Sequence, residues 1–110
     1  MSRLGTARVR VPARARRGEV FEIRAMVEHP MESGFRLDNV GKPIARHIAE
    51  SLAVVYDGHE VFRATLHPAV STNPYFVFTA VATVSGDIRF DWTDDEGGRV
   101  THVSKIAVET

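Results

Sequence analysis

The chain has 110 residues, enough for one domain with its own hydrophobic core, and 44% of them are hydrophobic. Its 14 basic and 14 acidic residues cancel, which argues against a nucleic-acid-binding module, because such modules carry a basic excess. There is no cysteine, so thiol chemistry, disulfides and thiolate metal sites are excluded on this chain. No apolar run approaches the roughly 20 residues of a membrane span.

The N-terminal segment is rich in arginine. Residues 7–12 alternate between valine and arginine, which predicts a short strand that Pro12 ends or places at a sheet edge. Such arginine density is typical of a solvated edge strand guarded by charge, with an anionic partner as the alternative. The first eleven residues lack the apolar region of a secretory signal, so the residues alone predict a cytoplasmic chain or export by another route.

The clearest strand covers residues 19–28. Phe21, Ile23, Ala25 and Val27 share one face there, and charged residues occupy most of the other, as expected for a strand with one buried face. The Asp57-Gly58 pair predicts a tight hairpin turn. Further strands are expected over residues 48–56, 59–66, 75–84, 87–93 and 100–108.

Short strands separated by turn signals predict an all-β fold. We expect an immunoglobulin-like antiparallel β-sandwich of about seven strands, formed as a single domain by residues 1–110. The main alternative is a helix over residues 43–53, where Ile44, Ile48 and Leu52 recur at helical spacing.

A long polar connection runs from His29 to His47. It exceeds the roughly 12–15 residues beyond which a loop is usually functional or disordered. Its apolar residues favour an ordered loop at one end of the sandwich, near a partner, over a solvated linker. These apolar residues are Met31, Phe35, Leu37, Val40 and Ile44.

The sequence does not assemble catalytic machinery. No two of the five histidines have the close spacing of a metal-ligand pair, although His29, His47 and His67 could meet at one end of a sandwich. The acidic run at residues 94–96 is typical of a hairpin turn. We therefore expect no enzyme, catalytic residue, cofactor or metal ligand, and a binding module instead.

The stretch from Tyr75 to Val84 is apolar on both faces. We assign Phe76, Phe78 and Ala80 to the core, since they are wholly apolar. The outward set is then Tyr75, Val77, Thr79 and Val81. An exposed apolar face of this kind commonly marks an association site.

Three blocks of the sequence resemble the SoxZ family, the small subunits of sulfur-carrier complexes. The first is HPMESG at residues 29–34, continued by Arg36, Asp38, GKPI at 41–44 and Arg46. The others are PAVSTNPY at 68–75 and FDWTDDEG at 90–97. The departures, Ser33, Ala45 and Gly98, remove no chemically special group.

The resemblance implies a β-sandwich that pairs with a SoxY-type subunit. That partner carries sulfur intermediates of thiosulfate oxidation on the cysteine of a C-terminal Gly-Gly-Cys-Gly-Gly arm, which agrees with the absence of cysteine here. It also implies a periplasmic location, reached by export together with the partner's signal, and a possible homodimer when the partner is absent.

We predict the partner interface from three parts of the sequence. They are the connection from His29 to His47, which we call the signature loop, the second block, and the outward set of residues 75–84. Its residues are His29, Pro30, Met31, Arg36, Asp38, Lys42, Arg46, Asn73, Pro74, Tyr75, Val77, Thr79 and Val81. The alternative is a stand-alone β-sandwich metal-binding protein or enzyme that uses the loop histidines.

Overall fold

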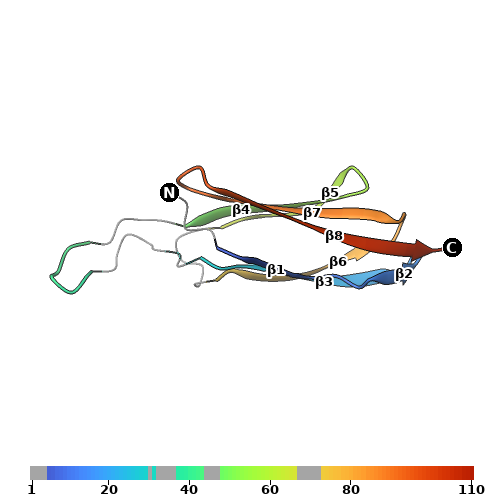
Figure 1. Cartoon of the computed structure of the whole chain (residues 1–110), viewed down its shortest axis with the longest axis horizontal. Coiled ribbons are helices and arrows are strands. Elements are labelled where there is room, and N and C mark those ends of the chain that lie inside the picture. The colour runs from blue at the N-terminus through green and yellow to red at the C-terminus, as the bar shows by residue number, and fades with distance from the viewer. Residues whose placement is uncertain (1–4, 30, 32–36, 44–47, 67–72) are drawn as a thin grey trace.

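Two β-sheets lie face to face in an elongated molecule (Figure 1). The computed structural model describes residues 5–29, 31, 37–43, 48–66 and 73–110. These residues form eight strands and no helix. Nothing in this part of the chain is therefore a helix that could cross a membrane. The predicted all-β class is confirmed.

The smaller sheet has three antiparallel strands in the order β1-β3-β6. They are β1 (Ala7–Arg10), β3 (Val20–Val27) and β6 (Tyr75–Val81). β3 is the predicted alternating strand, and its four predicted inward residues are buried. The central strand pairs on both sides, whereas β1 and β6 each leave one edge open among the described strands.

The larger sheet has five strands in the order β2-β8-β7-β4-β5. They are β2 (Arg14–Arg16), β4 (Ala49–Tyr56), β5 (His59–Thr65), β7 (Gly86–Asp94) and β8 (Arg99–Glu109). All pairings are antiparallel except that of β2 with β8. The hairpin between β4 and β5 turns at Asp57 and Gly58, both in the left-handed region, as the Asp-Gly signal predicted.

The N-terminal strand prediction needs a correction, because two strands stand where one was expected. β1 ends at Arg10, and β2 begins at Arg14 in the other sheet. Pro12 lies between them and has no N–H to continue the ladder, so the chain crosses from one sheet to the other here. β2 is short, and only Ala15 of its three residues is buried, which gives almost no pattern to detect.

The helical alternative for residues 43–53 is wrong over 49–53, which belong to β4, while 44–47 lie outside the described residues. β6 also ends earlier than expected, at Val81. Beyond it, the Tyr56 hydroxyl accepts hydrogen bonds from the N–H groups of Thr83 and Val84, at 3.0 and 3.1 Å. Those N–H groups therefore donate to a side chain and not to a neighbouring strand.

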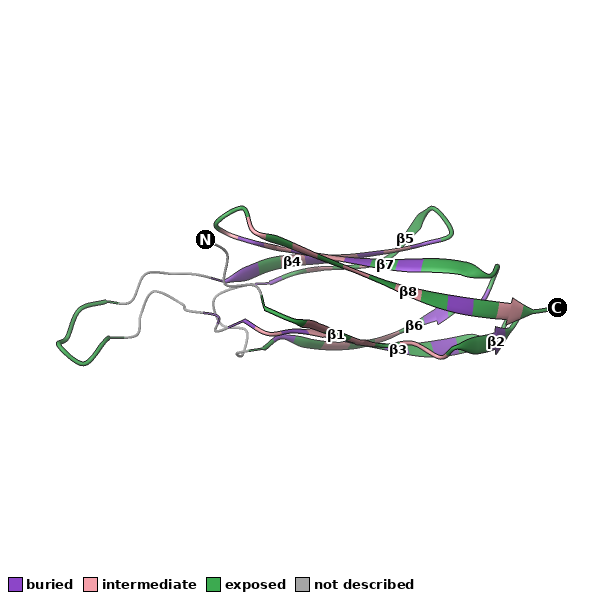
Figure 2. Cartoon of the chain, viewed as in Figure 1, coloured by how far each residue is buried: buried purple, intermediate pink, exposed green. Residues whose placement is uncertain are grey.

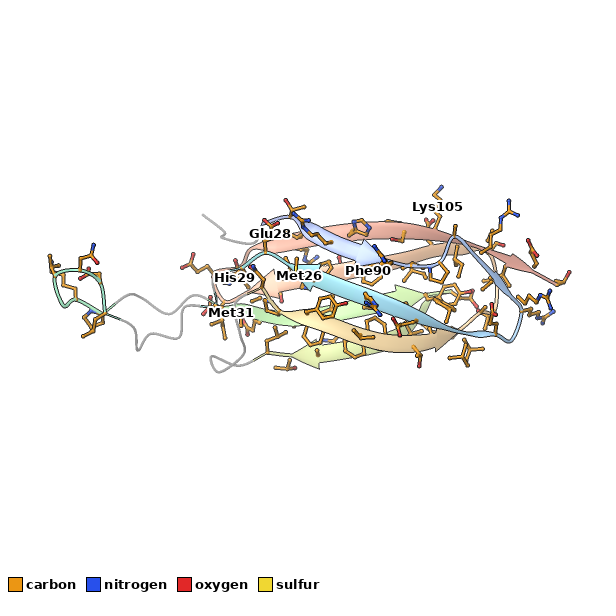
Figure 3. The ribbon with its side chains drawn as sticks, turned by 90° about the horizontal axis from the view of Figure 1, so that it is seen from below. Met26, Glu28, His29, Met31, Phe90 and Lys105 are labelled. Atoms are coloured by element: carbon orange, nitrogen blue, oxygen red, sulfur yellow. The ribbon has the colours of Figure 1, made fainter. Side chains whose placement is uncertain are left out.

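The core lies between the sheets along β7. Ile88, Phe90 and Trp92 have no exposed surface, which confirms the inward row predicted from alternation. Figure 2 shows buried segments of β7 in purple, and Figure 3 labels Phe90. Phe90 and Trp92 stack with ring centroids 6.0 Å apart. Ile23 of β3 and Leu52 of β4 are equally buried.

Candidate partner-binding surface

The outward face of β6 carries an apolar strip. Tyr75, Val77 and Val81 expose 53%, 51% and 50% of their surface, and Thr79 between them is also exposed. The predicted assignment of odd residues outward and even residues inward is confirmed. We call Tyr75, Val77, Thr79 and Val81 the outer strip.

The inward residues of β6 rest on the other sheet's edge strand. Phe78 stacks on Phe62 of β5 with ring centroids 4.1 Å apart and an interplanar angle of 7°. Phe76 lies 5.8 Å from the same ring. Because β5 and β6 are both edge strands, these rings are only half-buried. Sequence reasoning did not single out Phe62, although its place among the apolar residues of β5 was visible.

A charged pair borders the outer strip on β3. Arg24 lies opposite Val77 and Glu22 lies opposite Thr79. The Arg24 Nε donates to the Glu22 carboxylate at 2.6 Å. That hydrogen bond and the negative charge of Glu22, with a smaller contribution from Tyr75, raise the pKa of Arg24. The apolar strip therefore has a charged border on one side.

The start of the signature loop is fixed at the same end of β6. Asn73 Oδ1 accepts from the His29 N–H at 2.9 Å, and the Asn73 N–H donates to the His29 carbonyl at 2.8 Å. His29 Nδ1 accepts from the N–H of Met31, which lies beside it at this end of the sandwich (Figure 3). Met31 and Asn73 both adopt positive φ, which is unusual for methionine.

These loop-start residues face inward. His29, Met31 and Pro74 are buried, and Met31 Sδ accepts from the Ala49 N–H at 3.1 Å. Their side chains therefore join the end of β3 to the starts of β4 and β6. They can influence a partner only by holding the loop in position, while Asn73 is exposed at its surface.

The outer part of the loop folds on itself. Asp38 Oδ1 accepts from the N–H groups of Val40 and Lys42, and the Asp38 N–H donates to the Lys42 carbonyl. Leu37 and Val40 are 58% and 78% exposed at this tip, which lies beyond one end of the sandwich (Figure 1). Asp38 was predicted to face a partner, and here it shapes a turn that presents apolar side chains.

Three predicted interface residues, Pro30, Arg36 and Arg46, lie outside the described residues, as do His47 and His67. In the part of the chain that the structure does describe, no three His, Cys, Asp or Glu side chains are grouped to hold a metal. The expected acidic turn is present after β7, where buried Asp94 accepts from the N–H groups of Glu96 and Gly98.

The architecture of this chain is similar to that of proteins with solved structures. Two facing, largely antiparallel sheets define an all-β sandwich of immunoglobulin-like type. A superoxide reductase (neelaredoxin) from Ignicoccus hospitalis superposes with a TM-score of 0.69 at 17% identity, covering 96% of this chain and 82% of that one. A Thermotoga maritima protein assigned to the same enzymes gives 0.73 at 20% identity, covering 96% and 87%. At such identities the likeness is one of fold.

Residues 9–105 match the family of sulphur oxidation protein SoxZ. The chain belongs to the SoxZ family, which confirms the resemblance found in the three sequence blocks, and its role is in sulfur oxidation. A search of curated proteins gave no sequence match.

Proposed function

We propose that this chain is the non-catalytic subunit of a sulfur-carrier complex and pairs with a SoxY-type subunit through the outer strip. The family match supports a sulfur-oxidation role, and a chain without cysteine must leave the carrier thiol to another subunit. The observation that carries the surface assignment is the row of half-exposed apolar side chains on β6. Contiguous exposed apolar surface of this kind commonly marks an association site.

The two subunits of the proposed complex have different roles. The partner carries the sulfur intermediate on the cysteine of its C-terminal Gly-Gly-Cys-Gly-Gly arm, and this chain supports that subunit in the periplasm after export with it. The turn at residues 37–43 extends away from both sheets, so it is suited to a second contact. The charged group of Lys42 there would affect association rate more than affinity.

The test is co-expression with a SoxY-type chain, followed by size-exclusion chromatography and titration. Val77→Asp should weaken pairing by at least about tenfold, because the interface would bury a carboxylate. Val103→Asp is the matched control: Val103 is 48% exposed on the outer face of the larger sheet. It should pair normally, and both variants should keep the wild-type circular dichroism.

Two results would contradict the proposal. Failure of the wild-type chain to pair with any SoxY-type subunit removes the function, and normal pairing of a folded Val77→Asp variant removes the outer strip from it. Stoichiometric zinc, copper or iron in the purified protein would favour the alternative, a metal protein that uses the loop histidines. Cell fractionation after co-expression tests the periplasmic location.

A further inference from the structure

We propose that the free edge of β6 is a strand-addition site, at which an extended, uncharged segment of the SoxY-type partner hydrogen-bonds to the β6 backbone. This rests on the proposed function and specifies how pairing is achieved. The partner segment would become a fourth strand of the smaller sheet. Recognition would then involve the main chain of β6 as well as the side chains of the outer strip.

The alternation of hydrogen bonds along β6 shows which of its backbone groups do not pair with β3. In an antiparallel pair, alternate residues bond to the neighbouring strand. The Val27 N–H donates to the Pro74 carbonyl, and the Ala82 N–H donates to the Glu19 carbonyl. Even-numbered residues of β6 therefore bond to β3, and the odd-numbered residues direct N–H and C=O groups to the other side. No described strand pairs there.

The open backbone groups belong to the residues of the outer strip. The odd-numbered positions of β6 thus combine exposed, mostly apolar side chains with main-chain donors and acceptors that bond to none of the described residues. An extended peptide satisfies both, because its backbone completes the ladder while alternate side chains cover the strip. A flat protein surface or a helix would cover the side chains and leave the backbone groups unbonded.

Among the described strands, the other sheet edges carry protecting features and β6 carries none. Edge strands normally carry charges, bulges or proline, or are very short. β1 holds Arg8 and Arg10 and is followed by Pro12, and β2 has three residues. β5 contains the ion pair of Arg63 with Glu60 and is itself bulged at Val61, where its register against β4 shifts. β6, by contrast, reads YFVFTAV, with no charge and no proline in seven residues.

A hollow at one end of the edge provides a place for a partner side chain. It has a volume of about 350 Å³ and lies between the β4–β5 hairpin and the end of β6. Tyr56, Val61 and Val81 contribute apolar surface, and Asp57 and His59 contribute polar groups. An apolar side chain on the added strand would fill the hollow and fix the register of pairing.

We assign the added strand to the SoxY-type partner because the chain belongs to the SoxZ family, which implies such a partner. A second copy of β6 would also bring apolar and hydroxyl groups to the outer strip, so the pairing of two copies is an outcome that the test must distinguish. A heterologous strand that carries one large apolar group for the hollow has a single best register.

The experiment uses proline to remove one outward N–H. Thr79→Pro deletes a donor that faces the free edge, a position where edge strands tolerate proline, so the fold should persist. Thr79→Ala keeps the N–H and is the matched control. We expect Thr79→Pro to weaken pairing at least about tenfold more than Thr79→Ala does, with native circular dichroism for both.

Amide exchange in the wild-type complex gives an independent measurement. The amides of Tyr75, Val77, Thr79 and Val81 should exchange fast in the free chain and at least about tenfold slower in the complex. Those of Phe76 and Phe78 should already be slow in the free chain. This difference between odd- and even-numbered amides tests strand addition even if Thr79→Pro fails to fold.

Each outcome has one meaning. Normal pairing by a folded Thr79→Pro variant, or odd-numbered amides that stay fast in a stable complex, overturns strand addition and leaves the proposed function standing. Absence of any wild-type complex overturns the proposed function and this inference together. A wild-type homodimer that Thr79→Pro converts to a monomer would assign the edge to a second copy instead.

Discussion

β3 and β6 are neighbours in one sheet and present alternate residues to the same outer face, yet they differ in what they expose. β3 places the ion-paired Glu22 and Arg24 outward, whereas β6 places Tyr75, Val77 and Val81 there. β3 also pairs on both sides, and β6 pairs on one. The strand paired on both sides carries an ion pair in the middle of its outer face, between Val20 and Met26, whereas the strand left open carries no charge on that face. The open strand is therefore where another chain is expected.

The largest expected effect tests the inner faces of the two strands. Phe78→Asp should unfold the protein, because an unpaired carboxylate between the sheets costs several kcal/mol against a total stability of about 5–15 kcal/mol. Ile23, its partner in register, is completely buried, so Ile23→Asp should be at least as damaging. Circular dichroism and denaturant melts give the readout. A folded Phe78→Asp variant beside an unfolded Val77→Asp variant would mean that the faces are reversed.

The second prediction removes a side chain of the core row on the opposite sheet. Phe90 is fully buried in the row along β7, so Phe90→Ala should lower the free energy of unfolding by about 3–5 kcal/mol. Urea denaturation measures this loss. A change below about 1 kcal/mol, the range of surface substitutions, would show that Phe90 is not part of the core.

The third prediction concerns the end of β6. The Tyr56 hydroxyl accepts from the N–H groups of Thr83 and Val84 and donates to the Val84 carbonyl at 2.6 Å. Burial raises the pKa of this phenol, but hydrogen bonds with the Thr83 side chain and with the backbone of Thr83 and Val84 outweigh that effect and lower the pKa. Tyr56→Phe should cost about 1–3 kcal/mol, because backbone groups lose their partner.

Amide exchange localises that effect. Thr83 and Val84 should lose protection in Tyr56→Phe, while the amides of β3 should keep theirs. Equal loss of protection in both strands would show that Tyr56 supports the whole sheet and not the end of β6 alone.

The smallest expected effect on stability is at the outer strip itself. Val77→Asp should change the free energy of unfolding by no more than about 0.5 kcal/mol, because half of Val77 is exposed. Arg24 lies opposite on β3 and would face the new carboxylate. Thermal melts of the isolated chain measure the difference. A loss of several kcal/mol would mean that the strip is part of the fold and not a surface for a partner.

The fold was largely predictable because alternation and turn chemistry are local signals. The period of two in β3 and β7 gave both their location and their buried faces, and Asp57-Gly58 gave the hairpin. β2 was missed because three residues cannot show a period, and because its parallel pairing with β8 joins segments from opposite ends of the chain.

The candidate surface was predictable in part. The parity of β6 followed from the contrast between its wholly apolar core set and the two residues that tolerate water, Tyr75 and Thr79. That β6 lies at an edge, with Phe62 beneath it, depends on sheet order, which no local pattern encodes. The burial of His29 and Met31 was missed for a similar reason, since their partners Asn73 and Ala49 are distant in sequence.

The crossing of the N-terminal segment between the sheets has a mechanical consequence. β1 is bonded to β3 in one layer, and β2 is bonded to β8 in the other. Beyond β2, the Arg17 N–H donates to the Glu109 carbonyl, and the Gly18 N–H donates to the Ala82 carbonyl beside β3. The continuous backbone from β1 through β2 to Gly18 thus links the two sheets and fixes their relative position. If a bound chain exerts a force on the edge of one sheet, this backbone segment transmits the force to the other sheet. The two sheets therefore resist sliding past each other.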